Sequence, residues 1–166
     1  MSLDRRILVL GYGNPGRQDD GLGPAAAQAI EQWRLPGVNV EVNYLLNIED
    51  AAEAAEHDLV LFIDAAADGP EPFEMHEVMP ANSMTFTSHV VPPSTILAIC
   101  DQCYQHVPEA WLLAIRGYEF ELIEELTDAA RDNLEKALTH IRHWLHASFF
   151  TPTVNKVQDL KQVQSP

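Results

Sequence analysis

The chain has 166 residues, which is the length of about one domain, and 46% of them are hydrophobic. Ten basic against 25 acidic residues give a formal net charge of −15, which argues against binding to nucleic acid or to an anionic membrane surface. No apolar run reaches the roughly 20 residues of a membrane-spanning helix, no signal peptide is recognisable, and two cysteines make no disulfide framework, so we expect a cytoplasmic globular protein.

Strand and helix patterns alternate along the chain. Continuous apolar runs such as "RILVLGY" (6–12) are typical of strands that are buried on both faces. The last helix shows one apolar stripe at helical spacing. In chain order, the patterns predict strands at 6–12, 38–46, 58–64, 73–79 and 110–118, and helices at 22–34, 48–56, 92–105 and 127–146.

This alternation predicts an α/β fold, a single three-layer α/β/α domain with a mostly parallel, twisted sheet of about five strands. The strand at 73–79 is expected near an edge. The domain is expected over residues 1–147, and residues 148–166 are expected to form a C-terminal tail that frays. Ligands of such folds bind at the carboxyl ends of the strands, so functional residues are expected just after each strand.

The loop after the first strand carries the letters of a dinucleotide-binding fingerprint, Gly-x-Gly-x-x-Gly, at Gly11, Gly13 and Gly16. That fingerprint places its third glycine inside the following helix, whereas the helix here is expected to begin near Leu22. The second strand also ends without the acidic residue that would hold a ribose. Two aspartates in the loop would repel a pyrophosphate, so nucleotide binding is the less favoured alternative.

Three other residues lie at the expected positions for a functional site. Asp20 follows the first strand, Asp64 ends the third, and His89 precedes a later helix. All three are expected to converge on one edge of the sheet, where they make an open site for a divalent ion or orient a water for hydrolysis. Asp19 is an alternative to Asp20. Each residue alone also fits ordinary turn or capping chemistry.

A C-x-x-C pair, Cys100 and Cys103, lies late in the helix predicted at 92–105. A redox pair would open a helix rather than end one. We therefore interpret both thiols as small buried residues that share one helix face with Ile96.

Three motifs, taken together and in this order, resemble those of the maturation endopeptidases of nickel–iron hydrogenases. They are "ILVLGYGNPGRQDDGLG", "FIDA" and "SHVVPPSTIL". The resemblance implies an enzyme that removes the C-terminal extension of the hydrogenase large-subunit precursor after nickel insertion. It also implies that the nickel is carried by the precursor and serves as the recognition element.

By motif position, the resemblance makes Asp20, Asp64 and His89 both the metal-contacting and the catalytic residues. Many members of the family carry glutamate where this chain has Asp20. The implied partner is the large-subunit precursor, and the chain is expected to act as a monomer. A non-catalytic nickel-binding or chaperone module for hydrogenase assembly is the alternative, and the residues leave the catalytic base open between a metal-polarised water and a carboxylate.

Overall fold

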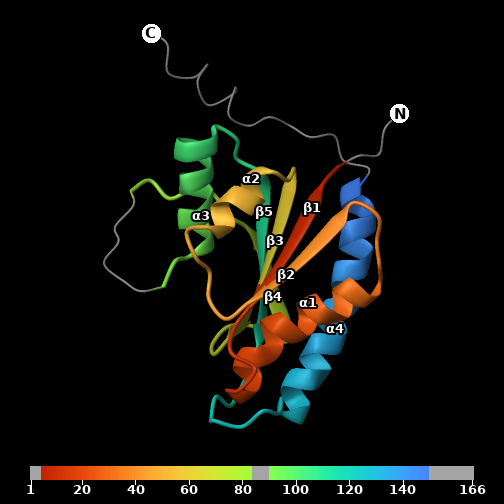
Figure 1. Cartoon of the computed structure of the whole chain (residues 1–166). Coiled ribbons are helices and arrows are strands. Elements are labelled where there is room, and N and C mark those ends of the chain that lie inside the picture. The colour runs from red at the N-terminus through yellow and green to blue at the C-terminus, as the bar shows by residue number, and fades with distance from the viewer. Residues whose placement is uncertain (1–4, 84–89, 150–166) are drawn as a thin grey trace.

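The structure is a computed structural model that describes residues 5–83 and 90–149. Its strands form one sheet, and helices cover both faces of it (Figure 1). The elements in chain order are β1 (Ile7–Tyr12), a 3-10 turn η1 (Gln18–Gly21), α1 (Leu22–Gln32), β2 (Val38–Asn43), α2 (Asp50–Ala55), β3 (Leu59–Ala66), β4 (Phe73–Glu77), α3 (Pro93–Ile99), a π-helical turn η2 (Cys100–Tyr104), β5 (Glu109–Arg116) and α4 (Asp128–Phe149).

The five strands are ordered β2-β1-β3-β5-β4 across the sheet. The pairs β1–β2, β1–β3 and β3–β5 are parallel, and β4 pairs antiparallel with β5 at one edge. The predicted α/β fold with a mostly parallel sheet of about five strands is therefore confirmed, and so is the edge position of the strand near residues 73–79.

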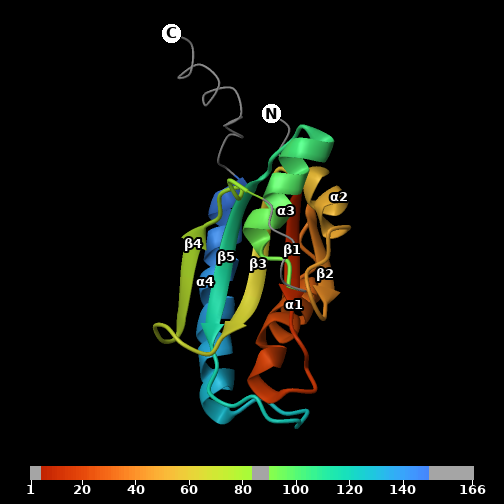
Figure 2. The same ribbon diagram turned by 90° about the vertical axis from the view of Figure 1, so that its left-hand side faces the viewer.

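Two layers of side chains cover the sheet, because successive residues of a strand point to opposite faces. Ile7 and Val9 of β1 pack with α1 and α4, whereas Leu8 and Leu10 pack with α2 and α3. Figure 1 shows the sheet nearly edge-on, with α3 and α4 on opposite sides of it, and Figure 2 shows the sheet face-on, with its strands side by side. Within the described part of the chain, no helix has both the length and the apolarity to cross a membrane.

The last helix runs through Phe149, three residues beyond the predicted end at His146. Phe149 packs against the core cluster of the α1/α4 face, and the Ser148 carbonyl accepts a hydrogen bond of 2.9 Å from Nη1 of Arg5. These contacts hold Ser148 and Phe149 in the helix, although both were expected in the tail. Residues 150–166 lie outside the described residues.

The interpretation of the C-x-x-C pair is right for Cys100 and wrong for Cys103. Cys100 is fully buried and its Sγ donates to the Ala51 carbonyl oxygen at 3.4 Å, but Cys103 is exposed. Helix α3 ends at Ile99 and continues as the π-helical turn η2. A π turn has more residues per turn than an α-helix, so Cys103 is rotated off the face that Cys100 buries.

Candidate active site

Helix α1 begins in direct contact with the ends of β1 and β3 because its second residue is glycine. A Cβ on Gly23 would overlap the Tyr12 carbonyl oxygen and would lie 2.6 Å from that of Ile63. Gly11, on β1, is equally confined, since its Cβ would lie 2.6 Å from that of Ala27. The glycines therefore allow close packing of helix on sheet, and Gly16 lies in the loop before α1 rather than inside it.

Asp64 lies where the neighbours of β3 change. β1 pairs with β3 only as far as Gly11 and Ile63, whereas β3 continues beside β5 through Ala66. Asp64 was expected at the end of its strand and is instead two residues before it. The connection after β1 leads to β2 on one side and the connection after β2 leads to β3 on the other, so β1 and β3 flank the topological switch point where such sheets bind ligands.

Asp20 reaches this switch point from the loop that follows β1. It lies in η1 and is partly exposed, and its Oδ2 accepts a hydrogen bond of 2.8 Å from the backbone N–H of Asn14. The Asn14 side chain in turn accepts from the Gly16 N–H at 2.9 Å, which is the Asx-type turn that is common in such loops. The loop therefore folds back on itself and fixes the position of the Asp20 carboxylate.

The two carboxylates influence each other electrostatically. The pKa of Asp64 is raised to about 6, chiefly by burial and also by the negative charge of Asp20, although hydrogen bonds from the Ala65 N–H and the Tyr12 hydroxyl lower it. Burial, the charge of Asp64 and the hydrogen bond to it raise the pKa of Tyr12 well above its usual range. A divalent cation between Asp20 and Asp64 would relieve this repulsion.

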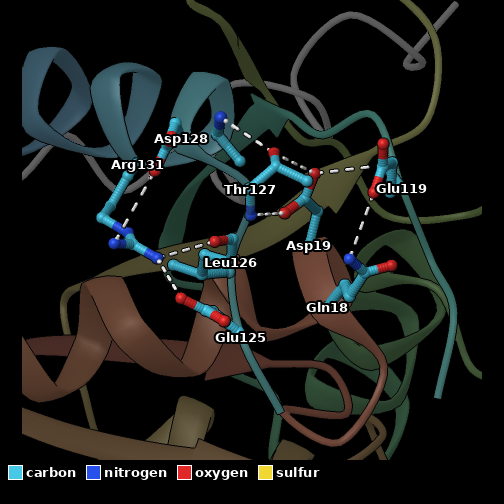
Figure 3. A network of polar contacts seen from close by, with 9 residues as sticks. Gln18, Asp19, Glu119, Glu125, Leu126, Thr127, Asp128 and Arg131 are labelled. Atoms are coloured by element: carbon cyan, nitrogen blue, oxygen red, sulfur yellow. Dashed lines mark hydrogen bonds and ion pairs between the residues drawn. The ribbon is translucent and has the colours of Figure 1, made fainter. Parts of the chain in front are cut away.

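Asp19 has a different role from its neighbour. It is fully buried, and its carboxylate accepts hydrogen bonds from the Thr127 N–H and hydroxyl at 2.8 Å each and from the Glu119 N–H at 3.2 Å (Figure 3). It also accepts one from the Tyr118 N–H at 2.8 Å. Burial raises the pKa of Asp19, but these donors outweigh it and hold the pKa below its usual value. Asp19 therefore ties the first loop to the segment before α4.

Gln18 extends this attachment, which we call the loop latch and define as Gln18 and Asp19 with residues 117–127. Its backbone N–H donates to the Ile123 carbonyl oxygen at 2.8 Å. Its side chain accepts from the Glu121 N–H at 3.0 Å and donates to Glu119 at 3.2 Å. The Thr127 hydroxyl also accepts from the Ala130 N–H at 3.2 Å, so the residue that binds Asp19 caps α4 as well.

The latch separates the two aspartates that the sequence left as alternatives. Asp19 uses its carboxylate within the fold, while Asp20, next to it, interacts with Asp64. The third candidate, His89, lies outside the described residues. Among residues 5–83 and 90–149, His, Cys, Asp and Glu form no group of three or more that would hold a metal ion.

Two surface hollows lie away from the paired carboxylates. One, of about 300 Å³, is lined by α1 and β2. The other, of about 460 Å³, lies between α4 and residues 71–72 and 118. Asp20 and Asp64 line neither of them.

The chain has the α/β fold of the hydrogenase maturation proteases. The hydrogenase maturating endopeptidase HybD from E. coli is 23% identical, with a TM-score of 0.70 over 86% of this chain and 93% of that one. The [NiFe] hydrogenase maturation protease HycI from Thermococcus kodakarensis is 23% identical, with a TM-score of 0.65 over 82% of this chain and 89% of that one.

An endopeptidase from E. coli, solved in solution, is 24% identical, with a TM-score of 0.68 over 86% of this chain and 93% of its own. At these identities the likeness establishes the fold. No protein-family model matches the sequence, and no curated protein sequence matches it either.

Proposed function

We propose that this chain is a hydrogenase maturation endopeptidase, which removes the C-terminal extension of the large-subunit precursor of a nickel–iron hydrogenase. The observation that carries the proposal is the Asp20–Asp64 pair at the switch point between β1 and β3. The fold, shared with the hydrogenase maturation proteases, supports it. The order of the first-loop, Asp64 and His89 motifs supports it as well.

In this proposal the nickel belongs to the substrate. Asp20, Asp64 and His89 bind the nickel that the precursor already carries. A precursor without nickel is therefore not positioned for cleavage and stays uncut. Two carboxylates and a neutral imidazole suit such a borderline divalent ion.

Cleavage is a hydrolysis. The oxygen of a water attacks the carbonyl carbon of the scissile peptide, the C–N bond breaks, and the departing nitrogen takes up a proton. A carboxylate at the switch point accepts the water's proton, or the substrate's nickel polarises the water, and the proposal leaves both open. The enzyme acts in the cytoplasm as a monomer on a folded protein, which does not require an enclosed pocket.

Mass spectrometry of a nickel-loaded precursor tests the proposal. Wild-type chain is expected to release the extension, and Asp64→Ala or His89→Ala is expected to slow release at least about a hundredfold, because the nickel then loses a ligand. Asp68→Ala, an exposed carboxylate four residues beyond Asp64, is the matched control and is expected to process at the wild-type rate.

Processing by both Asp64→Ala and His89→Ala at the wild-type rate would rule the assignment out. A wild-type chain that binds the nickel-loaded precursor but never cuts it would instead favour a non-catalytic nickel-binding or chaperone module. Tight binding of NAD or ATP in calorimetry would favour a nucleotide-binding protein.

A further inference from the structure

The loop between β2 and α2 exposes three large apolar side chains within five residues. Tyr44 is 68% exposed, Leu45 53% and Ile48 51%, while Leu46 between them is 4% exposed and belongs to the core. We call Tyr44, Leu45 and Ile48 the apolar ledge. Single exposed apolar residues are common on protein surfaces, but a cluster of this kind marks an interaction site.

The ledge is held in one conformation. The Asp50 carboxylate accepts hydrogen bonds from the side-chain amide of Asn43 at 2.9 Å and from the backbone N–H of Asn47 at 2.7 Å. The Asn47 side chain donates to the Leu45 carbonyl oxygen at 3.2 Å, and Leu46 anchors the loop in the core. Because the loop is already ordered, its apolar side chains lose little conformational entropy when a partner covers them.

The ledge is continuous with the proposed active site. The Gly13 N–H donates to the Asn43 carbonyl oxygen at 3.1 Å, which joins the start of the ledge loop to the start of the loop that carries Asp20. Leu46 and Tyr12 belong to the same core cluster, on the α2/α3 face. Asp64 lies on that face too, because it alternates along β3 with Phe62, whose side chain packs there.

The charge around the ledge indicates whether another protein or a second copy of this chain binds there. Glu41 and Glu49, which flank the ledge in the sequence, are exposed, and the whole chain carries −15. An acidic rim attracts a segment with basic residues and repels a second copy of this equally acidic chain. The favoured occupant is therefore another protein with apolar side chains flanked by lysine or arginine.

We propose that the apolar ledge binds the polypeptide of the hydrogenase precursor next to the cleaved bond, through apolar side chains with basic neighbours. This inference rests on the proposed function and adds a specificity-determining surface to it. Nickel brings the precursor's metal centre to Asp20 and Asp64, and the ledge orients the chain that leads away from that centre.

The test measures the Kd of nickel-loaded precursor for the full-length chain carrying Asp64→Asn, which keeps the complex uncut. Adding Tyr44→Ser, Leu45→Ser and Ile48→Ser together is expected to raise this Kd at least about tenfold, since exposed apolar anchors contribute most of such binding. The control, Met79→Ser with Tyr104→Ser, removes side chains that are 50% and 48% exposed near the amino ends of the parallel strands. It is expected to leave the Kd within about twofold.

A Kd that the ledge substitutions leave unchanged, or that the control raises equally, overturns the inference. A wild-type dimer in sedimentation that the ledge substitutions dissociate also overturns it, because the occupant is then a second copy. In the wild-type background the same substitutions are expected to raise KM without lowering kcat. A wild-type chain that binds but does not cut the precursor contradicts the proposed function alone, and the Kd comparison still decides on the ledge.

Discussion

Two adjacent aspartates, Asp19 and Asp20, differ in burial and in the use of their carboxylates. Asp19 is buried with four hydrogen bonds to its carboxylate, whereas Asp20 is partly exposed. A buried acceptor that is removed leaves its donors unpaired and costs stability, while a partly exposed carboxylate at a functional site costs little. We therefore expect Asp19 to matter for stability and Asp20 to matter for activity.

Substitution of these two residues by alanine is expected to separate the two properties. Asp19→Ala should lower the free energy of unfolding by about 3 kcal/mol or more, because the Thr127 and Tyr118 amides lose their acceptor. Asp20→Ala should change it by less than about 1 kcal/mol and abolish processing. Urea denaturation of both variants measures the difference, and equal midpoints would contradict the assignment of Asp19 to the latch.

Ionisation of Asp64 lowers the stability of the fold as pH rises, whereas ionisation of an ordinary paired carboxylate raises it. Its folded-state pKa is raised to about 6 from 3.8, so the native state binds its proton more tightly than the unfolded chain does. Below about pH 4 Asp64 is protonated in both states and carries no penalty, the penalty grows as pH rises from about 4 to about 6, and above about pH 6 it is fully present. The ionised Asp64 therefore destabilises the fold at neutral pH.

Asp64→Asn is accordingly expected to raise Tm at pH 8 by a few °C, since 1 kcal/mol corresponds to about 2–4 °C in a chain of this size. The amide oxygen still accepts from Tyr12 and the Ala65 N–H, but the charge beside Asp20 is gone. The gain should shrink as pH falls through 6 towards 4. Thermal unfolding at a series of pH values measures it, and a gain that is constant with pH would show that the Asp64 charge is not responsible.

At the scale of elements, the contact between α1 and the sheet depends on small residues. A methyl group on Gly23 would meet backbone oxygens of β1 and β3, which cannot move without distorting the sheet. Gly23→Ala is expected to cost on the order of 3 kcal/mol in unfolding free energy. Gly16→Ala is the matched control, because its Cβ would meet only the Asn14 side-chain oxygen, at 3.1 Å. Equal stability of the two variants would contradict this packing.

The sequence predicted the elements well where burial dictates the pattern. Strands β1 and β3 are covered on both faces, so their residues are apolar without interruption, and α4 shows its stripe. The extension of β3 to Ala66 escaped prediction because Asp64 interrupts the apolar run while backbone pairing with β5 continues. The π-helical turn after Ile99 escaped it because nothing in "CDQC" distinguishes a π turn from an α turn.

The candidate site could be predicted in part. Strand topology alone brings the ends of β1 and β3 together, which is why Asp20 and Asp64 were identified. The loop latch could not be predicted, because it joins Asp19 to Thr127, which is 108 positions away, through backbone amides that no motif marks.

At the scale of the whole molecule, the proposed site occupies one edge of a three-layer sandwich, and contacts within the described residues hold that edge in place. Helix α1 packs directly against the ends of β1 and β3. The loop latch joins the first loop to the start of α4, and Leu46 anchors the ledge loop in the core. A rigid edge of this kind suits recognition of a folded partner that brings its own metal.

Incubation of wild-type chain with nickel-loaded and nickel-free forms of the same large-subunit precursor, followed by intact mass measurement, tests the central claim most directly. We expect the nickel-loaded precursor to lose its C-terminal extension and the nickel-free precursor to remain intact, because the paired carboxylates then have no ion to bind. Equal cleavage of both forms, or cleavage of neither, would contradict the account.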